Sequence, residues 1–256
     1  MGEGDETVFG AQSFIVYKLA TIFMGGVCKS VPMPGMKYDL DAMRDAVTDK
    51  TKVVFMTNPN NPTGCVVKQS EVENFVRSLP ENVVFCYDEA YTEYQRDPVD
   101  LRGLISEGYN VICLRTFSKI YGLAGLRIGY SYSSEEIAGY INRVREPFNV
   151  NSLAQVAALA ALDDDDFVRL SRDVNDAGRK QFEKAFEELG LEYFSDGANF
   201  VMVKVADAPK KFVEMQKRGV IVRPNVGYGL PDWLRITIGK PEQNERCIEE
   251  LSKLVK

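Results

Sequence analysis

The sequence predicts an α/β fold in which a mostly parallel sheet flanked by helices is followed by a smaller C-terminal α/β domain. Short, nearly continuous apolar runs alternate with helical periods, as expected for parallel strands buried on both faces. Polar clusters follow three of these runs directly. Near residue 190 the pattern changes to short strands interleaved with single helices. We therefore expect a large domain over residues 1–189 and a small domain over residues 190–256.

The expected elements of the large domain follow from these periods in chain order. Ser70 and Glu73 have the spacing of a capping box, which predicts a helix from there to about Leu79. Gly190 is expected to end the last helix of this domain. The apolar, β-branched runs predict strands over 51–56, 82–87, 110–115 and 127–132, and the helical periods predict helices over 134–145, 152–162 and 167–189.

The small domain is predicted to mix strands and helices in one compact layer. A helix over 209–218 is expected to end at Gly219, and another is expected to run from about Pro241 to the end of the chain. The expected strands cover 199–205, 220–223 and 233–238.

Composition limits the chemistry of the chain. None of the 256 residues is histidine, which excludes a Ser-His-Asp triad, a histidine-ligated zinc ion and a histidine general base. The formal net charge of −6 argues against a nucleic-acid or membrane surface. Five widely spaced cysteines without a C-x-x-C pair are typical of reduced thiols rather than a metal site. We therefore expect a cytoplasmic protein that binds no metal.

Three polar clusters are placed where a ligand site is expected. They are Asn58–Gly64, Asp88–Tyr91 and Thr116–Lys119, each directly after a predicted strand. Right-handed crossovers bring the carboxyl ends of parallel strands to one edge, where open α/β sheets bind ligands. Each cluster alone is as typical of a turn, a cap or a surface charge. Their occurrence in order favours one crevice that holds an amide, a carboxylate, a phenol, hydroxyls and a lysine.

These motifs match a known family. NPNNPTG at 58–64, YDEAY at 87–91 and RTFSKIYGLAGLRIGY at 115–130 resemble the fold-type I aminotransferases, which depend on pyridoxal phosphate (PLP). The likeness is closest to the histidinol-phosphate aminotransferases. PFNVNSLAQVAALAAL at 147–162 and LRITIG at 234–239 are similar to the same branch. The resemblance implies that the large domain is the PLP-binding domain.

The resemblance implies catalytic roles for Lys119, Asp88 and Tyr91. Lys119 would bond covalently to the PLP aldehyde and then act as the general base that the absence of histidine requires. Asp88 would face the pyridine nitrogen and keep it protonated. Tyr91 and Asn61 would hydrogen-bond the 3-oxygen of the cofactor.

The resemblance also implies further cofactor contacts. Thr116, Ser118 and Arg127 would bind the PLP phosphate, which suits two hydroxyls and a guanidinium. Phe14 lies where the family places an aromatic side chain against the cofactor ring, although a core role beside Ile15 is an equally open interpretation. The glycines within 122–129 do not match G-x-G-x-x-G, so we expect no dinucleotide site.

Substrate contacts are implied for three further residues. Arg235 would bind the substrate anion, with Arg223 a weaker candidate for the same anion. Asn199 would help to orient the substrate. A structural salt bridge is the alternative for Arg235, and a turn or cap is the alternative for Asn199.

The function implied is transamination of L-histidinol phosphate, the amino donor, with the 2-oxo acid 2-oxoglutarate, in histidine biosynthesis. A homodimer is implied as well, because the cofactor sites of this family lie at a subunit boundary. One alternative is an aromatic amino-acid aminotransferase, and threonine-phosphate decarboxylase is a related activity. Another is a truncated relic of the PLP fold that acts as a non-catalytic dimerising module.

The chain departs from the family at its beginning. It opens at the strand before Phe14, whereas family members carry a preceding region that includes a Gly-Ser-type loop for the PLP phosphate. We therefore expect an N-terminally incomplete large domain with weakened retention of the cofactor.

Overall fold

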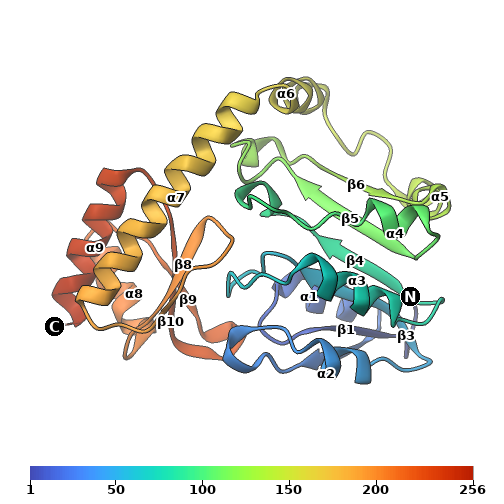
Figure 1. Ribbon diagram of the computed structural model, residues 1–256, viewed down its shortest axis with the longest axis horizontal. Coiled ribbons are helices and arrows are strands. Elements are labelled where there is room, and N and C mark those ends of the chain that lie inside the picture. The colour runs from blue at the N-terminus through green and yellow to red at the C-terminus, as the bar shows by residue number, and fades with distance from the viewer. Residues whose placement is uncertain (256) are drawn as a thin grey trace.

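The larger of two sheets forms the N-terminal half of the fold. The structure, a computed structural model, describes residues 1–255. Six strands follow the order β2-β1-β3-β4-β5-β6, and all neighbours are parallel except β5 and β6 (Figure 1). This confirms the mostly parallel sheet that the sequence predicts. The strands are β1 (Glu6–Gly10), β2 (Val27–Val31), β3 (Thr51–Thr57), β4 (Val84–Asp88), β5 (Val111–Thr116) and β6 (Gly129–Ser133).

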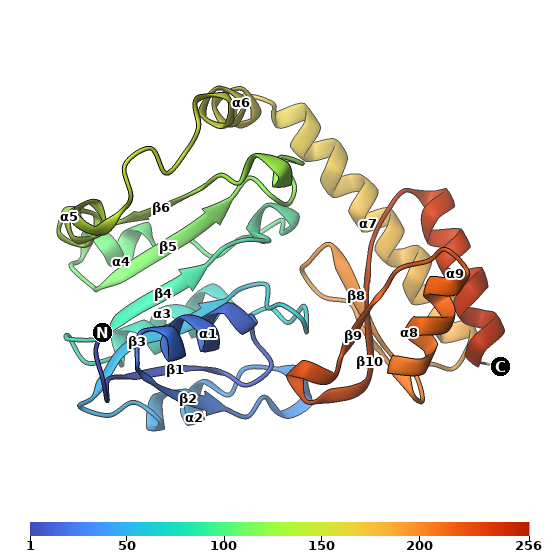
Figure 2. The same cartoon turned by 180° about the vertical axis from the view of Figure 1, so that it is seen from behind.

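Helices cover both faces of this sheet. Figure 1 shows α3 in front of the strands, and Figure 2, seen from behind, brings α1 to the front. In α3 the buried residues Val72, Phe75 and Val76 form one apolar stripe, and Phe75 packs edge-on against Phe85 of β4. The helices are α1 (Ile15–Phe23), α2 (Leu40–Asp45), α3 (Gln69–Arg77), α4 (Arg102–Ser106), α5 (Glu135–Val144) and α6 (Ser152–Leu162).

The second sheet has four antiparallel strands in the order β7-β8-β10-β9. Its apolar core is a separate cluster, to which the long helix α7 contributes Phe182 and Phe186. The division at residue 190 stays a prediction. The elements are α7 (Asp165–Glu188), β7 (Tyr193–Phe194), β8 (Phe200–Lys204), α8 (Ala208–Lys217), β9 (Arg223–Asn225), β10 (Leu230–Thr237) and α9 (Pro241–Val255).

The start of α3 corrects one predicted cap. The helix begins at Gln69, and the backbone N–H of Lys68 donates to Glu71 Oε2 at 3.0 Å. The capping box predicted at Ser70 and Glu73 is therefore wrong. The carboxylate of Glu73 instead accepts a hydrogen bond from Gln69 Nε2 at 2.6 Å, within the first turn of the helix. Because glutamates occur at both position 71 and position 73, the sequence was compatible with either start of the helix.

Other boundaries shift for similar local reasons. The strand predicted over 220–223 is wrong in its position, because β9 begins only at Arg223. The backbone N–H of Val220 still bonds the carbonyl of Met215, so this segment completes the end of α8. Among residues 1–255, no helix combines the length and the apolarity that crossing a membrane requires.

Candidate active site

The parallel register brings the three polar clusters to one edge of the larger sheet. Thr57 of β3 pairs with Asp88 of β4, and Asp88 pairs with Leu114 of β5, so the three strands end side by side. Backbone hydrogen bonds extend this order beyond the strands, since Asn58 N–H donates to the carbonyl of Asp88 at 3.0 Å. The loops that follow are therefore held next to one another, as the sequence predicts.

Asp88 lies at the centre of this edge. Its Oδ2 accepts a hydrogen bond of 2.7 Å from the hydroxyl of Tyr17, and its Oδ1 accepts one of 3.0 Å from the backbone of Ala90. Burial raises the pKa of Asp88, while the Tyr17 hydrogen bond, the Ala90 hydrogen bond and the charge of Lys119 oppose that rise. The carboxylate is thus held by fixed donors and faces a lysine.

Tyr17 is a functional candidate that the sequence reasoning missed. It is a buried residue of α1, and its ring stacks on Phe55 of β3 with centroids 4.7 Å apart. This stacking aims the hydroxyl at Asp88. The signal in the sequence was weak, because Tyr17 and Thr21 simply mark the buried face of a short helix.

Lys119 follows β5 and is half-buried. Its Nζ lies 5.2 Å from the centre of the Tyr91 ring. Burial and the charge of Arg235 lower the pKa of Lys119, and the charge of Asp88 opposes them. A half-buried amine with a lowered pKa is suited to act as a base or a nucleophile.

Tyr91 lies beside Lys119 and contacts the second sheet. The residue is buried, and its ring meets Phe200 of β8 edge-on with centroids 5.4 Å apart. Burial raises the pKa of Tyr91 to about 12, so the phenol is neutral and can donate a hydrogen bond. The contact joins the two sheets at the site.

Arg235 of β10 reaches the same edge from the second sheet. Its Nη1 donates to Oδ1 of Asn61, and its guanidinium lies 4.9 Å from the centre of the Phe200 ring. Its Nε is buried without a hydrogen-bond partner in the part of the chain that the structure describes. A buried donor of this kind is suited to an incoming anion.

Arg223 stands directly opposite Arg235 in the β9–β10 pair. Both residues line a cavity of about 560 Å³ together with Phe212, Pro224 and Thr237. Arg223 is exposed, whereas Arg235 is half-buried. The structure therefore places two arginines on the same cavity, one of which, Arg235, reaches Asn61.

The three residues predicted to bind phosphate lie at the end of β5 and in the segment that follows it. The Thr116 hydroxyl accepts a hydrogen bond from the backbone N–H of Ser118 at 3.0 Å. Arg127 is exposed, has a left-handed backbone with φ 54°, and donates to the carbonyl of Ala124 at 2.7 Å. Its charge also acts on Lys119. The three residues are therefore near Lys119.

Phe14 and Asn199 lie at the margins of the site. Phe14 directly precedes α1, and its ring meets that of Tyr17 edge-on with centroids 5.8 Å apart. Asn199 accepts a backbone hydrogen bond from Ile238 at 2.9 Å and directly precedes β8. The two roles predicted for Phe14, a cover for the cofactor ring or a core residue, stay open. So do the two predicted for Asn199, a substrate contact or a turn or cap.

A buried ion-pair network lies beside the site and was also missed. Glu89, which follows Asp88, has a fully buried side chain that accepts from Arg115 Nε at 2.6 Å and from the hydroxyl of Tyr132. Arg115 also pairs with Glu93 at 3.3 Å. These bonds join the ends of β4 and β5 to β6. The sequence around Glu89 in the YDEAY motif gives no indication that Arg115 is its partner.

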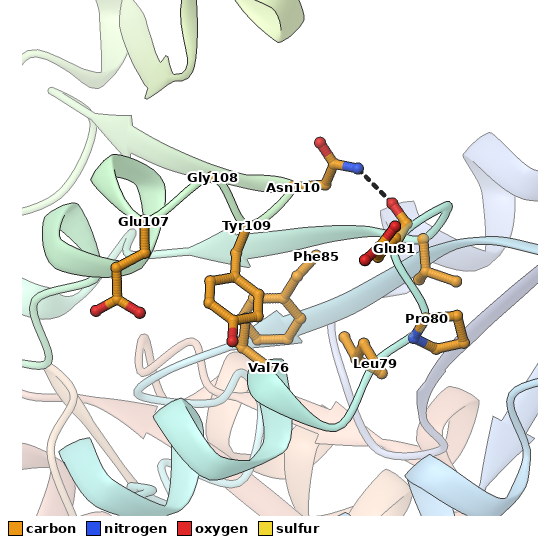
Figure 3. Close-up of a pocket in the computed structure, with 10 residues that line it drawn as sticks. Val76, Leu79, Pro80, Glu81, Phe85, Glu107, Gly108, Tyr109 and Asn110 are labelled. Atoms are coloured by element: carbon orange, nitrogen blue, oxygen red, sulfur yellow. Dashed lines mark hydrogen bonds between the residues drawn. The ribbon is translucent and has the colours of Figure 1, made fainter.

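A cavity of about 670 Å³ lies at the opposite end of the sheet (Figure 3). It is lined by the end of α3, the start of β4 and the segments that precede β4 and β5, and two of its polar residues bond neighbouring groups. Asn110 donates to the carbonyl of Glu81 at 2.6 Å, and Glu107 pairs with Arg77 at 2.5 Å. Of the residues that the structure describes, none of those predicted for the site lines this cavity. Size alone therefore does not identify the site.

Comparison with known proteins adds to this geometry. The family model described as aminotransferase class I and II matches residues 1–251. A histidinol-phosphate aminotransferase of Akkermansia muciniphila is 45% identical, over 98% of this chain and 69% of that protein. Histidinol-phosphate aminotransferase 1 of Nitrosococcus oceani is 46% identical, over 98% of this chain and 68% of that protein.

Solved structures agree in fold. The crystal structure of histidinol-phosphate aminotransferase from Sinorhizobium meliloti, in complex with pyridoxal-5'-phosphate, is 28% identical and has a TM-score of 0.92. It covers 100% of this chain, which in turn covers 71% of it. A Thermus thermophilus aspartate aminotransferase variant, at 23% identity with a TM-score of 0.89, shares the fold.

Proposed function

Because this chain belongs to the class I and II aminotransferase family, we propose that it transfers the amino group of L-histidinol phosphate to 2-oxoglutarate with PLP as cofactor. The names of its curated relatives, which are 42–46% identical to it, support this substrate. The observation that carries the proposal is the convergence of Lys119, Asp88 and Arg235 at one edge of the sheet. An amine, a carboxylate and a guanidinium are then available to one bound molecule.

The residues at this edge fit PLP. Lys119 offers a half-buried amine for the aldehyde, and Asp88 offers a carboxylate for the ring nitrogen. Asn61 and Tyr91 would hydrogen-bond the 3-oxygen. The phosphate would be held by Thr116, Ser118 and Arg127, with Phe14 against the ring face.

The chain's own groups then divide the chemistry. When bound, PLP supplies an electron-withdrawing ring that stabilises negative charge at the substrate Cα. Lys119 Nζ removes the proton from that Cα, and its lowered pKa increases the fraction of amine able to do so. Asp88 holds a proton on the ring nitrogen by its negative charge, and Tyr17 holds Asp88 in place.

The arginine pair favours a phosphorylated substrate. Like charges directly opposite each other on neighbouring strands are destabilising, and a dianion between them removes that cost. Arg235 and Arg223 would bind the phosphate of histidinol phosphate or the carboxylate of the acceptor, and the unpaired Nε of Arg235 would become satisfied. Asn199 would help to orient the bound substrate.

The proposed enzyme is a homodimer in the cytoplasm. Large apolar side chains are exposed on α1, where Phe23 is 88% exposed, and on α6, where Leu153 is 76% exposed. Apolar faces of this extent are typical of protein interfaces. All five cysteines, each within residues 1–255, are free thiols, which suits a reducing compartment.

A spectral titration tests the cofactor assignment. Purified protein titrated with PLP should develop an absorbance band near the visible edge that Lys119→Ala abolishes. Lys184→Ala, which changes an exposed lysine of α7, should leave the band unchanged. A band that survives in Lys119→Ala would contradict the assigned covalent bond.

Amine exchange then tests the substrate. Adding glutamate should convert the visible band to that of the amine form, and histidinol phosphate should do so with a much lower half-saturating concentration than histidinol. The difference should shrink in Arg235→Lys. Equal responses to the two amines would overturn the phosphate assignment, and no response to any amine would indicate a non-catalytic binding module.

A further inference from the structure

We infer that Asn60 is a positioning residue that ties the loop before Phe14 to the loop carrying Asn61. This inference rests on the proposed function, because it concerns how that site is held together. Asn60 lies in the cluster that the sequence marks as a turn, and its side chain is fully buried. Nothing in a turn requires a buried amide with all its hydrogen bonds made inside the protein.

The Asn60 side chain bonds two distant segments and its own loop. Its Nδ2 donates to the carbonyl of Gln12 at 2.7 Å and to the hydroxyl of Thr63 at 2.8 Å. Its Oδ1 accepts from the hydroxyl of Tyr38 at 2.9 Å. Both polar atoms of the amide are therefore engaged: two of the three bonds fix the segments of Gln12 and Tyr38, and the third, to Thr63, closes the loop itself.

Tyr38 makes this arrangement rigid. Its hydroxyl also accepts from the backbone N–H of Thr57 and lies within bonding distance of the Thr57 carbonyl, both at 3.2 Å. Gly10 at the end of β1 makes room for the ring, since a Cβ there would stand 2.8 Å from Tyr38 Cε1. The fold thus admits an aromatic ring against the end of β1, and its hydroxyl meets Thr57 at the end of β3 and Asn60 in the loop that follows.

Two site residues are held through this amide. Gln12 lies two residues before Phe14, the proposed cover of the cofactor ring. Asn61 follows Asn60 directly and accepts from Arg235, the proposed anion ligand. A change at Asn60 should therefore loosen Phe14 and Asn61 together, although Asn60 itself is not a proposed contact of the cofactor or of the substrate anion.

The same loop provides a matched control. Asn58 is also fully buried and also makes three side-chain hydrogen bonds. They run to Val67, through both its backbone N–H and its carbonyl, and to the hydroxyl of Tyr87. Asn58 therefore anchors the loop to the core, whereas Asn60 anchors it to the segment before Phe14.

Hydrogen exchange of the cofactor-free protein tests the tie directly. Asn60→Ala should accelerate amide exchange in residues 10–14 as well as in residues 58–64. Asn58→Ala should accelerate exchange in residues 58–67 and leave residues 10–14 at the wild-type rate. Unchanged exchange of residues 10–14 in Asn60→Ala would overturn the inference, whether or not the wild-type protein binds PLP.

Cofactor binding tests the consequence for the site. Asn60→Ala should raise the apparent Kd for PLP at least about five-fold, as expected for the loss of one or two hydrogen bonds, and should shift the absorbance maximum of bound PLP. Asn58→Ala should change the Kd for PLP by no more than about two-fold and should leave the absorbance maximum in place. This should hold even if Asn58→Ala lowers the free energy of unfolding as much as Asn60→Ala does. Effects on PLP that follow stability alone in both variants would overturn the positioning role.

Tyr38→Phe keeps the test decisive should Asn60→Ala fold poorly. It removes one of the three bonds and leaves the ring in place, so it should shift the PLP spectrum and the exchange of residues 10–14 in the same direction by a smaller amount. If the PLP spectrum and the exchange rates of Tyr38→Phe equal those of the wild-type protein, the inference is contradicted. Failure of the wild-type protein to bind PLP would overturn the proposed function alone.

Discussion

The amine of Lys119 lies among charges of both signs, which makes its protonation a sensitive measure of the site. Burial and Arg235 lower its pKa, and Asp88 raises it. Only the neutral amine can attack the aldehyde of PLP. The rate of covalent capture should therefore rise with pH to a midpoint below the ordinary lysine value of about 10.4.

Arg235→Gln should move this midpoint to higher pH. Removing a neighbouring positive charge makes the protonated amine less unfavourable, so the pKa of Lys119 rises and less neutral amine is present at a given pH. The midpoint is measured by stopped-flow absorbance between about pH 6 and about pH 10. Arg223→Gln is the control, because Arg223 is not among the charges that act on Lys119; a midpoint that falls in Arg235→Gln would refute the assignment.

Asp88→Asn should separate cofactor capture from catalysis. A neutral amide still accepts a hydrogen bond from Tyr17 but cannot hold a proton on the ring nitrogen, so the visible band should persist. Single-turnover conversion with glutamate should slow at least about a hundred-fold. The surface variant Asp45→Asn should turn over normally, and near-normal turnover in Asp88→Asn would contradict the role of Asp88.

At the scale of single elements, helix α7 is fitted closely to the second sheet. A Cβ on Gly178 would stand 2.5 Å from Ile238 Cγ2 and 2.7 Å from Asn244 Nδ2. Gly139 in the exposed helix α5 has nothing within 4 Å of such a Cβ. The same substitution, glycine to alanine, can therefore be compared at a crowded helix position and at an open one.

Gly178→Ala should lower the free energy of unfolding by about 1–3 kcal/mol, because overpacking at this contact exceeds the gain in helix propensity. Gly139→Ala should instead raise it by up to about 1 kcal/mol, since only the propensity changes. Urea denaturation of both variants measures the difference. Equal effects of the two substitutions would show that the contact between α7 and the turn at Gly239 does not constrain the helix.

At the scale of the whole molecule, the exposed apolar face of α6 is the feature that bears on assembly. Figure 1 shows α6 at the outer margin of the fold, between β6 and α7. Leu153, Val156 and Leu159 are each at least 66% exposed. A homodimer through this face would remove these side chains from water.

Val156→Glu should shift the proposed dimer toward monomer, because burying an unpaired carboxylate in an apolar interface is costly. Sedimentation velocity at several protein concentrations measures the shift. Val213→Glu changes an exposed apolar residue of α8, which packs on the second sheet, and should leave the dimer intact. An unchanged sedimentation coefficient in Val156→Glu would place the interface elsewhere.

Much of the larger sheet could be predicted from sequence because its signals are local. The strands β3, β4 and β5 are apolar on both faces, and their boundaries differ from the predicted ones by one or two residues. The helix α1 and the strand β2 were not predicted, because Lys18 and a glycine pair interrupt their apolar period. The start of α3 was misplaced because Glu71 and not Glu73 bonds the backbone at the helix start, and both lie within the first turns.

The convergence of the candidate site was predictable for the same reason that the sheet was. Parallel strands end at one edge, so Asn61, Asp88 and Lys119 were expected near one another before any contact was known. Their partners were not predictable. Tyr17 is 71 residues from Asp88, and Asn61 is 174 residues from Arg235.

The sequence by itself determined the class of fold, the edge at which the polar clusters gather and, through the absence of histidine, that any general base is another residue type. These properties follow from periodicity and composition, which are local or additive. Only the tertiary structure decided that Tyr17 holds Asp88, that Arg235 retains a free buried donor and that Asn60 joins the loops of Gln12 and Asn61. Those contacts depend on how distant segments pack and on the direction of each side chain, which no spacing along the chain encodes.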